Sequence, residues 1–247
     1  MKLGKKPARP DAVKFKFRAY FDMPNLPTPP MAFGHYQAVQ HWGMFGNDKF
    51  GDCVWAGAAH ETMLWHSEVG TSVQFDDKSV LANYTAVTGF NPSDPNTDEG
   101  TDMQLAASYR RQTGLLDATG DRHQILAYVA ITPKDIDALV RAVYLFGAVG
   151  VGIEFPRTAL PQFDNGLPWS VVPNARLDGG HYVSCVGRNE VGNLLVVTWG
   201  KIQEMTPEFF TTYNDENCVY LSLDMIRNNV SPDNIDLESL QRDLAAL

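Results

Sequence analysis

The sequence is poor in cysteine and in positive charge, and it lacks a long apolar run. Three cysteines in 247 residues are too few for a disulfide scaffold, so a reducing compartment is expected. The formal net charge of -9 argues against a nucleic-acid partner, which requires a basic surface. No window approaches about 18 uninterrupted apolar residues, and the basic segment MKLGKKPARPDAVKFKFR lacks the apolar stretch of a secretory signal. We therefore expect no membrane partner and a cytoplasmic location.

What the chain does contain is enough apolar sequence, 44%, for a substantial core. Residues 1–45 are rich in proline and aromatic residues without periodicity, which predicts an extended arm laid over the folded body. Helix-type patterns dominate residues 46–120, and strand-type patterns dominate residues 121–225. This segregation predicts an α+β fold, with a helical lobe packed on an antiparallel sheet lobe. Residues 226–247 are typical of an amphipathic segment.

Capping patterns predict where the main helices begin and end. Asp52 is expected to cap a helix that runs to about Val69, and DDKSVLANYTAVTG is expected to end at Gly89. Thr101 with Gln104 forms a capping-box pattern, and Thr132 followed by proline predicts another N-cap. Four strand-type runs follow, AVGVGIEF, GHYVSCVG, NLLVVTW and CVYLSL, with RNEVGN as a hairpin turn between the middle two.

Cys53 stands out among the three cysteines because it falls where the loop GNDKFGD enters a helix. The first turn of a helix offers unsatisfied N–H groups and the positive end of the helix dipole, and both favour a thiolate. Cys185 and Cys218 lie in apolar strand-type runs, where free cysteine packs as a small hydrophobic residue.

A reactive thiol needs a base, and His181 is the best placed of the six histidines. It opens an apolar strand directly after two glycines, where it can face the helical lobe across a cleft. His60 and His66 share the helix of Cys53 and lie roughly 10 Å or more from it along the axis. His35 and His41 fall in the arm and could in principle approach the thiol, whereas His123 falls in a loop, where a solvated role is the simpler interpretation.

Five segments, in this order, resemble those of papain-like cysteine peptidases of the broad C1 type, of a divergent bacterial or phage kind. They are GDCVWAGAAHE, EGTDMQLAASYRRQTGL, DIDALVRAVYLFGAVGVGIEF, GGHYVSCVGR and VVTWG, within about residues 40–223. The spacing from Cys53 to His181 is also close to that of the family. The resemblance implies a papain-like two-lobed fold.

The resemblance also implies roles for individual residues. Cys53 corresponds to the nucleophile and His181 to the base. Asn47 takes the position of the oxyanion-hole glutamine and offers the same amide donors. Val197 replaces the asparagine that orients the histidine in the family, a role that Thr198, a backbone carbonyl or water could take over. Further cleft residues are expected at Trp199, which would shield His181 from water, at Tyr182, at Thr198 and at Trp169, although Trp169 is also consistent with simple packing within its loop.

Three functions remain open at this point. The first is a cysteine peptidase or amidase that cleaves peptide or amide bonds through a Cys–His dyad and an acyl-enzyme. The second is an inactive papain-fold protein that serves as a binding or structural component, for instance of a virus particle. The third is an acyltransferase that uses the same dyad. We expect a peptide or protein substrate, no cofactor and no metal, because no Cys/His spacing fits a zinc site. The arm is a candidate contact for a second copy or an assembly partner.

Overall fold

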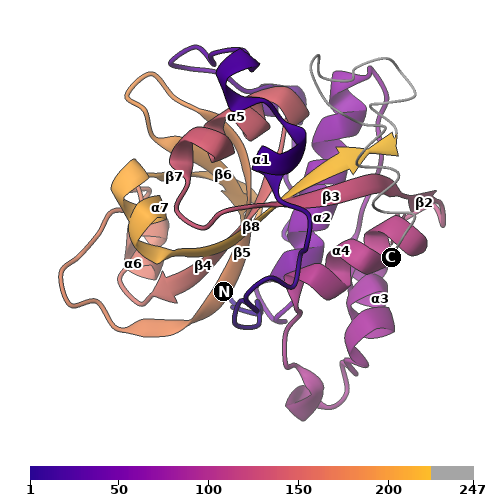
Figure 1. Cartoon of the computed structure of the whole chain (residues 1–247). Helices are drawn as coiled ribbons and strands as arrows, with labels where there is room; N and C mark the ends of the chain where they lie inside the picture. The colour runs from indigo at the N-terminus through magenta and orange to yellow at the C-terminus, as the bar shows by residue number, and fades with distance from the viewer. Residues whose placement is uncertain (224–247) are drawn as a thin grey trace.

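The computed structural model describes residues 1–223, and their helices and strands form two lobes (Figure 1). The helical lobe contains α2 (Cys53–Glu68), α3 (Asp77–Thr88) and α4 (Met103–Gln112). The second lobe is a six-stranded sheet with the strand order β3-β8-β4-β5-β6-β7, in which every neighbouring pair is antiparallel. The predicted α+β architecture, helices first and an antiparallel sheet second, is therefore confirmed.

The bounds of the remaining elements complete the description. The sheet is built from β3 (Ile125–Ile131), β4 (Val149–Pro156), β5 (Leu177–Arg188), β6 (Leu194–Thr198), β7 (Lys201–Met205) and β8 (Asn214–Ser222). Its helices are α5 (Ile136–Phe146), α6 (Ala159–Asp164) and α7 (Pro207–Tyr213), and a small hairpin pairs β1 (Leu115–Leu116) with β2 (Arg122–His123). The arm contributes α1 (Phe17–Tyr20), η1 (Met23–Asn25) and η2 (Tyr36–Ala38), and η3 (Pro95–Thr97) precedes α4.

Helix α2 lies between the lobes, and its sequence is apolar on nearly all sides. Twelve of its sixteen residues are buried, as expected for a helix enclosed by the sheet on one side and by α3 and α4 on the other. Helix α5, by contrast, has one apolar face, because Leu139, Val140, Val143 and Phe146 recur at helical spacing and pack on the sheet.

Of the three residues predicted as N-caps, one is correct and two are wrong. Asp52 occupies the N-cap position of α2, and Asp76, for which no prediction was made, caps α3. Helix α4, however, is capped by Asp102 rather than Thr101, and α5 by Asp135 rather than Thr132. In both cases a nearby carboxylate accepts a hydrogen bond from a first-turn N–H group, from Leu105 and Ala138 respectively. The Thr101 hydroxyl instead accepts a hydrogen bond from Trp55 Nε1.

The four predicted strands correspond to β4, β5, β6 and β8, and the predicted turn joins β5 to β6. Strands β3 and β7 were not predicted. Strand β7 follows β6 through a two-residue turn of Trp199 and Gly200, which have φ of +46° and +72°. Positive φ at both central residues is the signature of the tight turn that matches the twist of a hairpin.

The arm runs from the junction of the two lobes over the sheet lobe. Phe17, Phe21 and Leu26 are buried in the core between α5 and the sheet. Further along, Phe33 pairs with Arg188 through two backbone hydrogen bonds of 2.9 Å. The arm is thus tied to the sheet lobe at several points. The amphipathic segment predicted for residues 226–247 lies outside the described residues, and the predicted domain boundaries stay a prediction.

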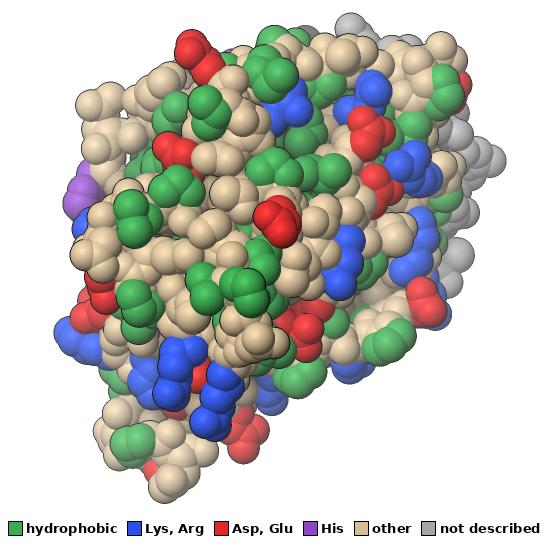
Figure 2. Space-filling model, turned by 90° about the vertical axis from the view of Figure 1, so that its left-hand side faces the viewer, with side chains coloured by type: hydrophobic (Ala, Val, Ile, Leu, Met, Phe, Trp, Pro, Cys, Tyr) green, Lys and Arg blue, Asp and Glu red, His purple; other side chains and the backbone are tan. Residues whose placement is uncertain are grey.

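The face of the molecule in Figure 2 carries hydrophobic side chains scattered among polar and charged ones, with several Lys and Arg side chains gathered near its lower edge. Isolated hydrophobic residues of this kind are common on protein surfaces. Within residues 1–223, no helix is both long and apolar enough to cross a membrane.

Candidate functional site

Cys53 is the first residue of α2 and lies at the junction of the lobes, with only 2% of its surface exposed. Two backbone N–H groups face its sulfur and lower the pKa of the thiol, one from Tyr182 on β5 and one from Gly4 in the arm. The first contact places the sulfur beside the peptide bond that joins His181 to Tyr182. Cys53 and His181 therefore lie in the same region of the structure, although they are 128 positions apart in the sequence.

Burial controls the charge state of the thiol in this conformation. Desolvation raises the pKa of Cys53 to about 12, and the two N–H groups and the nearby Lys5 ammonium oppose this only in part. The thiol is therefore neutral at pH 7, and a thiolate requires that water or a cation reach it.

His181 is fully buried and is held on two sides. Its Nε2 atom is 2.7 Å from the Thr198 hydroxyl oxygen, and its ring stacks on Trp199 with centroids 4.5 Å apart. Burial lowers the pKa of His181 to about 3, so the imidazole is neutral. Its Nδ1 atom has no hydrogen-bond partner within residues 1–223, and it is the ring nitrogen left for a proton transfer.

The Trp199–Gly200 turn explains how Trp199 reaches His181. Trp199 has a backbone φ of +46°, a conformation that residues other than glycine rarely adopt. This turn lies directly after Thr198, so one hairpin supplies both the hydroxyl that contacts Nε2 and the ring that stacks on the imidazole. Val197, where the family has its orienting asparagine, is buried in a different cluster, and Thr198 provides the hydrogen bond that Val197 cannot.

The tip of the arm occupies the cleft between the lobes. Lys5 N–H donates to the Gly180 carbonyl at 3.1 Å, next to His181. On the other wall, Thr101 N–H donates to the Gly4 carbonyl at 2.7 Å, and Lys6 N–H donates to the Thr101 carbonyl at 2.9 Å. The arm therefore adds a short extended segment between the helical lobe and β5.

Close approach of backbones fixes this tip in place. A Cβ atom on Gly4 would lie 1.9 Å from the Gly51 carbonyl oxygen, and one on Gly100 would lie 2.2 Å from the Gly4 oxygen. Lys2 extends the contact, since its N–H donates to the Asn47 carbonyl at 3.0 Å and its carbonyl lies 3.4 Å from Trp199 Nε1. Residues 2–6 thus cover Cys53.

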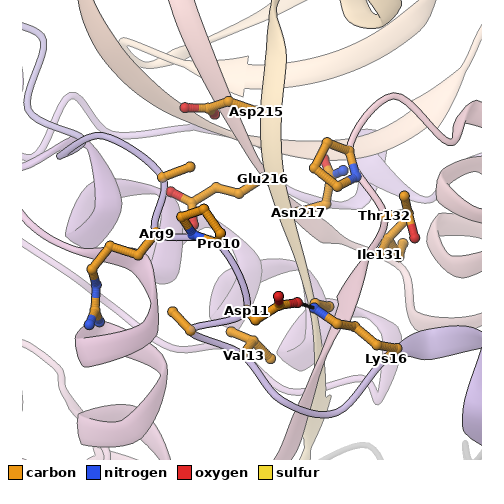
Figure 3. Close-up of a pocket in the computed structure, with 14 residues that line it drawn as sticks. Arg9, Pro10, Asp11, Val13, Lys16, Ile131, Thr132, Asp215, Glu216 and Asn217 are labelled. Atoms are coloured by element: carbon orange, nitrogen blue, oxygen red, sulfur yellow. Dashed lines mark ion pairs between the residues drawn. The ribbon is translucent and has the colours of Figure 1, made fainter.

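The Lys5 side chain has no exposed surface and ends between two carboxylates of β8. Its Nζ atom lies 2.8 Å from Asp215 Oδ2, 2.9 Å from Glu216 Oε1 and 2.9 Å from the Lys6 carbonyl. Beyond this contact, Asp215 and Glu216 line a cavity of about 400 Å³ between the arm and strands β3 and β8, where Glu216 extends toward the arm (Figure 3).

The other residues predicted for the site lie as follows. Both amide hydrogens of Asn47 are engaged, by the Phe50 carbonyl at 3.0 Å and by Asp52 Oδ1 at 3.1 Å, so its oxyanion role stays a prediction that requires a rearrangement. The Trp169 side chain is buried in the sheet-lobe core and donates to the Ala159 carbonyl. It packs within the lobe, which is the second of the two interpretations offered above.

The Tyr182 side chain is part of a buried polar network that the sequence did not reveal. Its hydroxyl donates to Glu61 Oε1 at 2.5 Å, and Ser184 donates to the same oxygen at 3.0 Å. Arg110 Nη1 donates to Glu61 Oε2 at 2.7 Å, and its guanidinium lies over the Tyr220 ring. This network joins α2, α4, β5 and β8, and it fixes α2 against the sheet. A Glu in the middle of a largely apolar helix indicates that its carboxylate is buried, although it does not indicate the partners.

Within residues 1–223, no group of three or more His, Cys, Asp or Glu side chains is arranged to hold a metal ion. Cys53, Cys185 and Cys218 are all free and buried. The predicted core placement of Cys185 and Cys218 is therefore confirmed.

A nucleophile helix packed on an antiparallel sheet, with a histidine on the strand that faces the cysteine, is the architecture of papain-like cysteine proteases, and the chain has that fold. Xylellain, a cysteine protease from Xylella fastidiosa, matches with a TM-score of 0.66 and 17% identity over 90% of this chain and 96% of its own. The Carica candamarcensis cysteine protease CMS1MS2, solved in complex with E-64, matches with a TM-score of 0.57 and 13% identity over 78% and 99% of the two chains. Procathepsin B S9 from Trypanosoma congolense matches with a TM-score of 0.55 and 10% identity over 89% of this chain and 86% of its own. By sequence, the chain matches no protein-family model and no curated protein.

Proposed function

We propose that the chain is a cysteine peptidase or amidase whose nucleophile is Cys53 and whose base is His181, and whose cleft is closed by residues 2–6 in this conformation. The observation that carries the proposal is the contact of Cys53 Sγ with the N–H group of Tyr182, the residue after His181. The papain-like fold supports the same assignment.

In the proposed reaction, His181 Nδ1 takes the thiol proton and the thiolate attacks a substrate carbonyl. The protonated imidazole then gives the proton to the leaving amine, and water hydrolyses the thioester. Thr198 accepts the hydrogen bond from Nε2–H, and the Trp199 ring keeps the imidazole in plane and shielded. The oxyanion accepts a hydrogen bond from the Cys53 backbone N–H at the start of α2. It accepts a second one from the Asn47 side-chain amide, once that amide has left the Phe50 carbonyl and Asp52 Oδ1.

The arm presents the N–H group of the Leu3–Gly4 peptide bond to the sulfur, while the Gly4 carbonyl accepts a hydrogen bond from Thr101 N–H on the helical lobe. Since desolvation is the main cause of the raised pKa of Cys53 and of the lowered pKa of His181, removal of the tip is expected to bring both toward the range in which a proton is shared.

The test uses the full-length chain with the substitution Lys5→Met, which loosens the tip, beside the natural sequence. A peptidyl epoxide is added, and the adduct is located by peptide mass mapping. We expect modification of Cys53 and of neither Cys185 nor Cys218. Adding His181→Asn to the Lys5→Met chain should abolish the modification while the melting temperature stays the same.

The alternatives give different results. If Cys53 in the loosened chain reacts no faster than Cys185, the chain is an inactive papain-fold protein and the proposal is wrong. If acyl groups pass to an added amine and no hydrolysis product forms, the same dyad serves a transferase.

A further inference from the structure

The pocket that holds the Lys5 side chain is part of the cleft that a substrate must enter. Lys5 follows Gly4, whose N–H contacts the sulfur, and its ammonium is close enough to lower the pKa of the Cys53 thiol. A substrate that replaces the tip therefore exposes its own side chains to the surroundings that Lys5 now has.

Those surroundings fit a long, cationic side chain. A Cβ atom on Gly152 would lie 2.4 Å from Lys5 Cε and 2.7 Å from Glu216 Cγ, so only glycine at this position of β4 leaves room for the methylene stem. At its far end the ammonium meets Asp215 and Glu216, whose side chains are only 17% and 21% exposed. The pocket thus has an uncharged floor along its length and negative charge at its end.

The pocket also has unused acceptor capacity. Asp215 Oδ1 is buried and has no hydrogen-bond partner within residues 1–223, while Oδ2 binds Lys5. A guanidinium presents five donors in a planar fork and can use both oxygens of one carboxylate. Arginine therefore fits the acceptors at least as well as lysine does.

In the closed conformation, the Lys5 ammonium offsets the cost of placing two carboxylates side by side. Burial raises the pKa of Glu216 above its usual range, and the neighbouring Asp215 charge adds to the effect, while the Lys5 ammonium opposes it. Two adjacent, largely buried carboxylates repel each other and gain most from a cation that enters with the substrate.

There is also space for the rest of a bound chain. Arm residues around Ala8 separate the cavity in Figure 3 from a second cavity, of about 440 Å³, which is lined by Glu154, Leu177 and Gly180 and shares Asp215. Both cavities border Asp215, so space for a peptide chain lies on either side of this carboxylate.

We propose that Asp215 and Glu216, with Gly152 as the floor, form a specificity subsite that selects a lysine or arginine side chain in the substrate, next to the bond that is cleaved. This inference rests on the proposed function of Cys53 and His181. It assigns to the enzyme a preference for basic peptides, and it explains why the arm carries a lysine at this point.

The experiment measures the rate at which peptidyl vinyl sulfones modify Cys53 in full-length Lys5→Met protein. The probes carry arginine, lysine, norleucine or glutamate at the first or second residue from the electrophile, with alanine elsewhere. Norleucine has the carbon chain of lysine without its charge. Any residual closing of the tip slows all probes equally, so the ratio of two rates reports on the pocket alone.

At one of the two positions, we expect the lysine and arginine probes to react at least about tenfold faster than the norleucine probe, since one charge-assisted hydrogen bond supplies that factor. Asp215→Asn and Glu216→Gln should each lower the ratio of lysine to norleucine several-fold. Glu99→Gln is the matched control, because Glu99 faces Lys6 across an exposed 3.7 Å contact at the same cleft, and it should leave the ratio unchanged.

A ratio below about twofold at both positions in the Lys5→Met protein overturns the subsite while Cys53 is still modified and the proposed function stands. The same holds if the ratio is high but neither carboxylate substitution lowers it. If no probe modifies Cys53 faster than iodoacetamide modifies Cys185, the proposed function fails and the subsite fails with it.

Discussion

Replacing Lys5 by methionine should release the tip of the arm and expose Cys53. The substitution keeps the apolar stem against Gly152 but removes an ammonium that lies 2.8 and 2.9 Å from two carboxylates. A hydrogen bond between charged groups contributes about 1.5–3 kcal/mol net, so two of them together stabilise the closed tip by at least about 3 kcal/mol.

At about 1.4 kcal/mol per factor of ten, this loss raises the population of the open tip by roughly 100-fold. The rate of Cys53 alkylation by iodoacetamide at pH 7, followed by mass spectrometry, should rise by the same factor until the tip is mostly open. Amide exchange at Lys6 and Thr101, whose N–H groups bond the arm to the helical lobe, should accelerate in parallel.

Lys6→Met is the control, because it removes the same charge one residue away. The Lys6 side chain is largely exposed and its ion pair with Glu99 is long, so alkylation should change by no more than about threefold. The reasoning is refuted if Lys5→Met leaves Cys53 as unreactive as before in a folded protein, or if Lys6→Met has an equal effect.

Three further outcomes are expected. Gly4→Val should expose Cys53 without any change of charge, since its Cβ would collide with the Gly51 carbonyl; retained exchange protection of the tip amides would contradict this. Thr198→Val leaves His181 Nε2 without its partner, and in a loosened chain it should lower kcat/KM for peptide hydrolysis about 5–150-fold, whereas Thr198→Ser, which keeps the hydroxyl, should stay near the parent value. Burial lowers the pKa of His60 to about 4, so the unfolded chain binds a proton below pH 6.5 that the folded chain does not, and stability falls as the pH falls. In urea titrations between pH 6 and 4, the free energy of unfolding of the natural sequence should fall with each pH unit by about 1.4 kcal/mol more than that of His60→Gln.

Local sequence signals located the helix that begins at Cys53, the strand of His181 and the order of the lobes, because each depends on residues a few positions apart. The same signals failed where two candidates competed. Thr101 and Thr132 have good capping chemistry, but Asp102 and Asp135 lie close by and carry the stronger acceptor. Strand β7 was missed because Trp199–Gly200 is an unusual pair for a two-residue turn.

The parts of the site that the sequence could not reveal are contacts between distant segments. Lys5 and Asp215 are separated by most of the chain, and nothing in either local pattern indicates that one is buried against the other. Glu61 and Arg110 lie on different helices, and neither helical pattern indicates that the two side chains meet. Such pairs are decided by how the lobes pack, which a one-dimensional pattern does not encode.

The buried anchor of the arm has a consequence for any substrate. Phe17 and Phe21 hold the arm in the sheet lobe even when the tip swings out, so a departed tip stays tethered beside the cleft. A short flexible tether keeps its end at a local concentration of about millimolar. Dilution cannot weaken such an intramolecular competitor. On the proposed function, an incoming peptide must bind the cleft more tightly than the tethered tip does. Alternatively, the segment between Lys6 and Phe17 must be cut, after which the tip can dissociate and diffuse away.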